Sequence, residues 1–95
     1  MTDFRVSGIV DGDTFDVSGG WTWKGQRGTR IRPTGYDAPE LPSHNGLIAK
    51  NRLSSLILNK VVQIGPAYRI DRGRLVAEVY FNGHRLADYF PEYRN

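Results

Sequence analysis

Hydrophobic and polar residues alternate in short stretches through the first third of the chain. This period of two predicts β-strands over Phe4–Val10 and Thr14–Val17, and a brief extended stretch at Trp21–Trp23. A third strand is expected over Thr29–Tyr36, and Pro33 within it indicates an edge or a bulge, because proline has no backbone donor. Turns rich in glycine should separate these stretches, at Asp11–Asp13, Ser18–Gly20 and Lys24–Gly28.

The middle of the chain changes to the spacing of a helix. Leu47–Asn59 carries one narrow apolar stripe, made by Ala49, Leu53, Leu56 and Ile57. Beyond it, Lys60–Ile64 and Leu75–Phe81 have the pattern of strands, and a Gly-Pro pair should end the first of them. Arg85–Phe90 is expected to form a short helix that the next proline stops, and the last residues should fray.

The order of these elements predicts the fold class. Three strands, a helix, two strands and a terminal helix make a β-rich α+β protein. Five strands with a helix between the third and fourth are the layout of the OB-fold, a small Greek-key barrel that often binds oligonucleotides. With 95 residues, the chain is long enough for one domain only, so residues 1–95 should form a single barrel with a short C-terminal helix.

Composition narrows the chemistry that the chain can perform. It has no cysteine and only two histidines, His44 and His84, which excludes disulfides, thiolate zinc sites and a cysteine nucleophile. Any metal should therefore be a hard cation held by oxygen ligands. The net charge is +3, and ten of the thirteen basic residues are arginine. Because the planar guanidinium suits phosphate, a nucleic acid or another anionic partner is expected.

Targeting signals are not apparent in the sequence. No apolar stretch approaches the roughly 20 residues that cross a bilayer. The first residues lack the basic and apolar pattern of a secretion signal. We therefore expect a cytoplasmic protein that does not contact membranes. We also expect it to be a monomer.

Charged residues concentrate in three segments, and these segments resemble a known family. The segments Val10–Phe15, Ile31–Glu40 and Asp71–Tyr80 resemble the three signature blocks of the staphylococcal-nuclease-like (thermonuclease) family. They occur in the family's order, with the predicted helix between the second and the third. The likeness extends from about Val6 to Ala87, and a barrel can bring all three segments to one end.

The resemblance implies an OB-fold core and calcium-dependent hydrolysis of DNA and RNA that leaves 3′-phosphates. Asp13 and Asp37 match the family's metal carboxylates, and Ala38 matches the residue whose backbone carbonyl binds the metal. Glu40 matches the general base that takes a proton from the attacking water. The residues expected to hold the substrate phosphate are Arg32, Arg72 and Arg74, of which Arg32 and Arg74 match the family's catalytic arginines.

Several departures from the family pattern keep other functions open. An aromatic residue is missing between Arg72 and Gly73, which could displace Arg74 and lower activity about 100-fold. The arm Leu41–Gly46 and the C-terminal portion are also short, and Pro33 and Tyr36 stand at usually aliphatic positions. The alternative functions are an OB-fold nucleic-acid binder with weakened catalysis and a protein-interaction module. Single-stranded DNA or RNA is the expected partner of both the nuclease and the binder.

Aromatic residues offer a further way to contact nucleic acid. Trp21 and Trp23 could stack on bases, as aromatic residues do in proteins that bind single strands. Packing of at least one of them against the barrel is the more common outcome for such residues. The sequence therefore favours packing over stacking.

Overall fold

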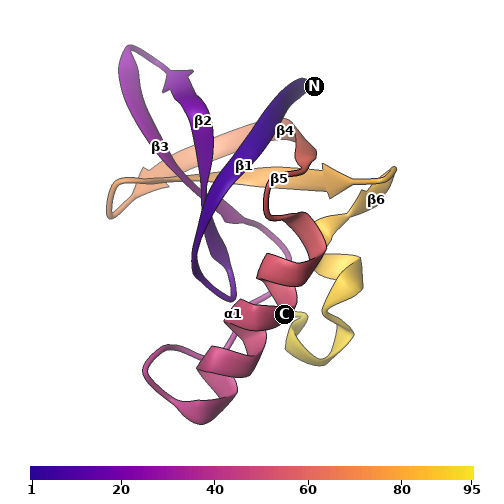
Figure 1. Ribbon diagram of the computed structural model, residues 1–95. Helices are drawn as coiled ribbons and strands as arrows, with labels where there is room; N and C mark the ends of the chain where they lie inside the picture. The colour runs from indigo at the N-terminus through magenta and orange to yellow at the C-terminus, as the bar shows by residue number, and fades with distance from the viewer.

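Five strands close into a mixed β-barrel in the computed structural model, which describes residues 1–95. One α-helix and a sixth, short strand complete the regular structure (Figure 1). The elements in chain order are β1 (Thr2–Asp11), β2 (Thr14–Trp23), β3 (Gln26–Pro33), α1 (His44–Ile57), β4 (Val61–Asp71), β5 (Arg74–Phe81) and β6 (His84–Arg85), followed by two 3₁₀ turns at Leu86–Tyr89 and Pro91–Tyr93.

The barrel closes through a parallel pairing between β3 and β5. All other neighbours are antiparallel, in the order β3-β2-β1-β4-β5-β6. In the closing pair, Ile31 lies opposite Leu75 and Arg32 lies opposite Val76. This pairing joins the second and third charged segments of the sequence. The first segment, at the turn between β1 and β2, reaches the same end because Phe15 lies opposite Ile31, which in turn lies opposite Leu75.

The core follows the alternation along the strands. Leu75, Ala77 and Val79 of β5 face inward and are buried. Helix α1 covers one end of the barrel, where it packs against β1 (Figure 1). Of the predicted apolar stripe on α1, three residues are buried and Leu56 is half-buried at the edge of the core. The largest fully buried side chains include Tyr36, Phe15, Phe90, Ile31 and Leu53.

Two turns predicted from glycine and proline are wrong, because the strands continue through them. β2 runs unbroken across Ser18–Gly20. Gly19 and Gly20 have φ of 77° and 73° and lie within a bulge against β3. β4 likewise continues past Gly65 and Pro66. The register of β4 against β5 shifts there, so the missing donor of the proline falls at an irregularity of the ladder.

The helix begins earlier than the apolar pattern predicts. α1 spans His44–Ile57, whereas the pattern predicts Leu47–Asn59. Ser43 explains the early start, because its side chain caps the helix by accepting a hydrogen bond from the Gly46 amide at 3.0 Å. The chain then leaves the helix, and Asn59 adopts a left-handed φ of 64°.

The C-terminal segment also differs from its prediction. The short helix expected over Arg85–Phe90 is a 3₁₀ helix at Leu86–Tyr89, preceded by the two-residue strand β6 and followed by a second 3₁₀ helix at Pro91–Tyr93. The final residues do not fray. Arg94 forms a bridge with Tyr36, and the Asn95 amide donates to the Gly35 carbonyl at 3.3 Å. The end of the chain is therefore fastened to the loop that follows β3, beside α1 (Figure 1).

Candidate functional site

All three charged segments line one polar cleft at an end of the barrel. The cleft encloses about 650 Å³, and only three of its seventeen lining residues are hydrophobic. The structure therefore brings together the residues that the sequence singled out. The charged groups that line it are Asp11, Asp13, Arg32, Asp37, Glu40, Arg69, Asp71, Arg72 and Arg74.

Asp13 is the most enclosed carboxylate of the cleft, with a side chain 12% exposed. Its Oδ2 accepts a hydrogen bond from the Ala38 amide at 3.1 Å and lies 3.5 Å from Nη2 of Arg32. Its own amide donates to Oδ1 of Asp11 at 3.0 Å. Burial, followed by the nearby Asp11 side chain, raises the pKa of Asp13 to about 6, and Ala38 and Arg32 oppose that rise.

Arg32 joins the two predicted metal carboxylates. Its Nη2 contacts the carboxylate of Asp13 and also that of Asp37. Its Nη1 donates to the carbonyls of Pro33 at 3.0 Å and Tyr36 at 3.3 Å. The backbone of the β3 terminus thus fixes the guanidinium, and one nitrogen remains directed at both carboxylates. Asp37 itself is 58% exposed, so it forms the outer side of this arrangement.

Arg74 lies at the start of β5, after a tight turn. Arg72 and Gly73 both have positive φ, 54° and 76°, as a two-residue hairpin of this twist requires. Nη2 of Arg74 contacts Oδ2 of Asp71 at 3.0 Å, and its Nη1 lies 3.5 Å from Oγ1 of Thr14. Although the turn lacks the aromatic residue of the family pattern, Arg74 still lines the cleft and reaches the neighbour of Asp13.

Glu40 lies at the rim of the cleft, and its carboxylate forms no hydrogen bond or ion pair with another residue. Its position depends on tight packing of the backbone. The Glu40 carbonyl accepts from the Ser43 amide at 3.2 Å and the Ser43 hydroxyl at 2.5 Å. A Cβ added at Gly46 would lie 2.3 Å from that carbonyl oxygen, so only glycine permits this close approach.

Tyr36 connects the loop after β3 to the first charged turn. Its hydroxyl donates to the Gly12 carbonyl at 2.9 Å, and its ring stacks on Phe90 with centroids 4.8 Å apart. Burial raises the pKa of this hydroxyl, which keeps it protonated as a donor. Nothing in the sequence pattern indicates this role of Tyr36, nor that Arg69 and Asn95 line the cleft. Asn95 donates from Nδ2 to Oδ2 of Asp37 at 2.6 Å.

Few carboxylates of the cleft lie close enough together to bind the same metal ion. No group of three or more His, Cys, Asp or Glu side chains is arranged to hold a metal ion. Asp13 and Asp37 meet only at the Arg32 nitrogen. A cation here would therefore depend on two carboxylates, backbone carbonyl oxygen and water.

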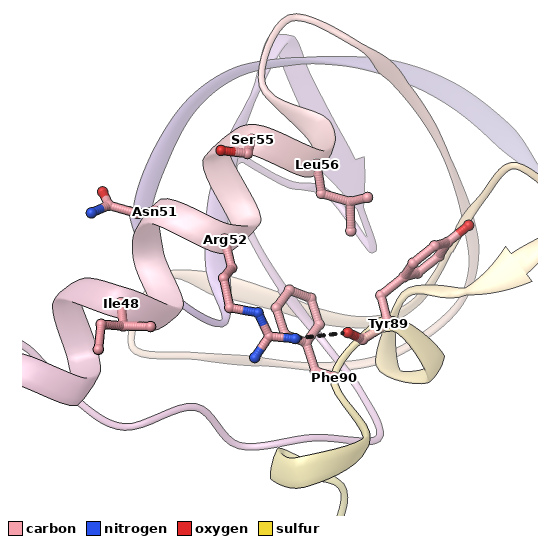
Figure 2. A pocket seen from close by; sticks show the side chains of 7 residues that line it. All are labelled: Ile48, Asn51, Arg52, Ser55, Leu56, Tyr89 and Phe90. Atoms are coloured by element: carbon pink, nitrogen blue, oxygen red, sulfur yellow. Dashed lines mark hydrogen bonds between the residues drawn. The ribbon is translucent and has the colours of Figure 1, made fainter.

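A second hollow lies between α1 and the C-terminal segment (Figure 2). It measures about 550 Å³ and is mainly apolar. Arg52 crosses it, donating to the Tyr89 carbonyl at 3.1 Å and lying over the Phe90 ring at 4.8 Å. This arginine fastens the C-terminal segment to α1. The hollow has no carboxylate or histidine, so we place the candidate site in the polar cleft instead.

The two tryptophans pack rather than project. Trp21 is 5% exposed, and its indole nitrogen donates to the Arg30 carbonyl at 2.8 Å. Trp23 is partly buried, with the Lys24 ammonium 4.8 Å from its ring centroid. Packing of Trp21, which the sequence favoured over stacking, is confirmed. His44 and His84 are both exposed and outside the cleft.

Comparison with known proteins adds no family assignment. No protein-family model matches the chain, and no curated protein matches it either. The structure contains no helix of the length and apolar character that crossing a membrane requires.

Proposed function

We propose that this chain is a small calcium-dependent nuclease that hydrolyses phosphodiester bonds in single-stranded DNA or RNA. The observation that carries the proposal is the convergence at Arg32, whose Nη2 contacts the carboxylates of both Asp13 and Asp37. Two carboxylates around one positive group, with three more arginines lining the same cleft, suit a cation and a phosphate together.

The fold is part of the proposal. We assign the closed barrel to the OB-fold Greek-key class. The strand order, the parallel β3–β5 closure and the position of α1 between β3 and β4 in the chain support this assignment. In such a barrel the cleft lies where the β1–β2 turn, the end of β3 and the β4–β5 turn meet.

A hard cation in the cleft would be held weakly, because no three carboxylate or histidine side chains converge there. Asp13, Asp37 and the Ala38 carbonyl would hold calcium, and water would complete its shell, because calcium prefers six to eight oxygen ligands. When bound, the ion would polarise a phosphate oxygen and offset its negative charge. The raised pKa of Asp13 fits this function, since an ionised carboxylate in a partly buried place gains from a cation.

The arginines would bind the phosphate through donors that now serve neighbouring acids. Arg32 keeps its Nη1 on two backbone carbonyls, so its Nη2 can exchange a carboxylate for a phosphate oxygen without moving the side chain. Arg74 would likewise exchange Asp71 for phosphate. Charge that develops on the equatorial oxygens would then be stabilised by guanidinium groups already in place.

Glu40 is the residue we assign as general base. Its carboxylate has no partner within the protein and lies at the rim, where a water could reach both it and a phosphate in the cleft. As the water oxygen bonds to phosphorus, Glu40 would take its proton, the bond from phosphorus to the 5′ oxygen would break, and that oxygen would take a proton from solvent water. The products would be a 3′-phosphate and a 5′-hydroxyl.

A cleavage assay on single-stranded DNA, with calcium and with a chelator, tests this function. We expect hydrolysis only with calcium. Glu40→Gln should lower turnover about 100-fold or more and leave substrate affinity nearly unchanged. Glu92→Gln removes an exposed carboxylate outside the cleft and is the matched control. Absence of metal-dependent hydrolysis by the unmodified chain would exclude the nuclease.

The second candidate is an OB-fold binder with weakened catalysis. The observation in its favour is the short turn at Arg72 and Gly73, after which Arg74 is held by Asp71. If Arg74 does not leave Asp71, the chain should bind single strands without cleaving them. Binding with no hydrolysis would therefore select this candidate. Failure to bind any nucleic acid would select the protein-interaction module.

A further inference from the structure

Two tyrosines and a glutamate form a fixed cluster on the outer face of β4 and β5. The hydroxyls of Tyr68 and Tyr80 each donate to a different oxygen of the Glu78 carboxylate, the second at 2.7 Å. These hydrogen bonds lower the pKa of Glu78 and keep it ionised. Tyr68 is nevertheless 53% exposed. Its ring is therefore held at one end and open to solvent over much of its surface.

A β-bulge places Tyr68 in this position. Ala67 pairs with Ala77, and Arg69 pairs with Val76, so Tyr68 is the extra residue on β4. Bulges of this kind redirect a side chain and are frequent beside functional sites. The bulge turns Tyr68 toward Glu78 on the outer face, whereas Ala67 packs against the core.

The cluster is continuous with the wall of the polar cleft. Arg69, the next residue after Tyr68, lines the cleft, as does its partner Val76. Glu78 is the next outward position on β5, about 7 Å further along the strand. Arg85 connects Tyr80 to the cleft. It pairs with Tyr80 in the β5–β6 ladder, and its Nη2 lies 3.5 Å from Oγ1 of the cleft residue Thr34.

We propose that Tyr68 stacks on a nucleobase of a single-stranded nucleic acid whose phosphate occupies the cleft. This inference rests on the proposed function. Proteins that bind single strands combine basic side chains along the path of the backbone with aromatic side chains beside it. Here Arg69 and Arg72 line the cleft, and Arg69 directly follows Tyr68 on β4. The bases of a duplex are already stacked on one another, so the arrangement selects single strands.

Glu78 determines which part of the nucleic acid lies over the cluster. Its negative charge repels a phosphate, so the backbone should follow the arginines while a base covers Tyr68. Both carboxylate oxygens already accept hydrogen bonds from tyrosine hydroxyls. The cluster would therefore contact the flat face of a base rather than form hydrogen bonds with its edge. Binding should then be independent of the base sequence of the nucleic acid.

The test is a binding titration with two single-stranded oligonucleotides of equal length, one of them without a base at several successive positions. We expect Tyr68→Ala to weaken binding of the complete oligonucleotide about 5- to 100-fold. It should not change binding of the abasic one. Tyr68→Phe keeps the ring and is the matched variant, with affinity close to that of the unmodified chain. A fluorescent 2-aminopurine base should be quenched by the unmodified chain and by Tyr68→Phe, but not by Tyr68→Ala.

The outcomes separate this inference from the proposed function. If the unmodified chain binds neither oligonucleotide, the proposed function fails and the stacking site fails with it. If Arg74→Ala weakens binding and Tyr68→Ala does not, the cleft is retained and the stacking site is rejected. An equal loss on both oligonucleotides by Tyr68→Ala also rejects stacking. Circular dichroism and the urea midpoint of each variant identify any loss that comes from unfolding.

Discussion

Asp13 combines negative charge with burial, and this combination has a measurable consequence. Its carboxylate accepts one amide hydrogen bond and faces one guanidinium, yet desolvation remains the largest influence on it. A residue placed to hold a cation is poorly solvated before that cation arrives. Such a residue should lower the stability of the protein on its own, as functional residues often do.

The pH dependence of stability tests this account of Asp13. Its pKa is about 6 in the folded chain, against 3.8 ordinarily. The folded state therefore binds more protons than the unfolded state between these values, and stability decreases as pH rises from 4 toward 6. The full difference corresponds to about 3 kcal/mol. Asp13→Asn removes this loss, so its stability relative to the unmodified chain should increase over the same interval, as measured by urea unfolding.

The matched control for Asp13→Asn is Asp3→Asn, which removes an exposed carboxylate on β1. The comparison is made without divalent cations, because a bound cation would favour the ionised form of Asp13. A stability difference between Asp13→Asn and the unmodified chain that stays constant from about pH 4 to about pH 7 would contradict the burial argument.

At the scale of elements, the site depends on how closely the β1–β2 turn approaches α1. A Cβ added at Gly12 would lie 2.6 Å from Cβ of Ala49 and 2.7 Å from Cβ of Ala38. Neither methyl group can rotate away, because both are attached directly to the backbone. The turn, the helix and the loop after β3 are therefore in direct contact through one glycine, and this contact sets the distance between Asp13 and the Ala38 amide.

Gly12→Ala should separate these elements and misplace Asp13. We expect a loss of about 1 to 3 kcal/mol in the free energy of unfolding, as for other overpacked sites. Turnover should fall about 100-fold, because small displacements of catalytic groups have effects of this size. Gly8→Ala on β1 is the control, since a Cβ there would meet only Oδ2 of Asp16 at 3.9 Å. Equal activity of the two variants would show that the contact does not position the site.

Some of these elements could be predicted from the sequence, and others depend on contacts that the local sequence does not reveal. The strand patterns of β1 and β5 and the convergence of the charged segments follow from local alternation and from the barrel order. The sequence predicts β3 over Thr29–Tyr36, but the strand spans Gln26–Pro33, because its start pairs with the end of β2 across a tighter turn than the glycines of Lys24–Gly28 indicate. The continuation of β2 through Gly19 and Gly20 does not follow from local alternation, since their sequence favours a turn and only pairing with β3 favours a strand. The C-terminal turns likewise depend on Arg52, which contacts Tyr89 and Phe90 from α1.

For the whole molecule, the distribution of charge matters more than its total. The chain has a net charge of +3, but five carboxylates and four guanidiniums line the cleft. The cleft is thus slightly negative within a basic protein. A divalent cation would reverse its sign, so attraction of a phosphate to the cleft should depend on that cation. This balance could not be derived from composition, because it requires knowing which charges share one surface.

The salt dependence of binding follows from the small number of arginines that can reach a phosphate. Each phosphate neutralised on a single strand contributes about −0.7 to the slope of log affinity against log salt. Three contacts, from Arg32, Arg72 and Arg74, give a slope of about −2 with calcium present. Arg72→Ala should reduce it to about −1.4, whereas Arg5→Ala, outside the cleft, should leave it unchanged. Fluorescence anisotropy between about 50 and about 200 mM salt measures these slopes.

A much steeper slope that Arg72→Ala does not alter would place the affinity on another surface, because a groove of four arginines and five carboxylates cannot release that many counterions.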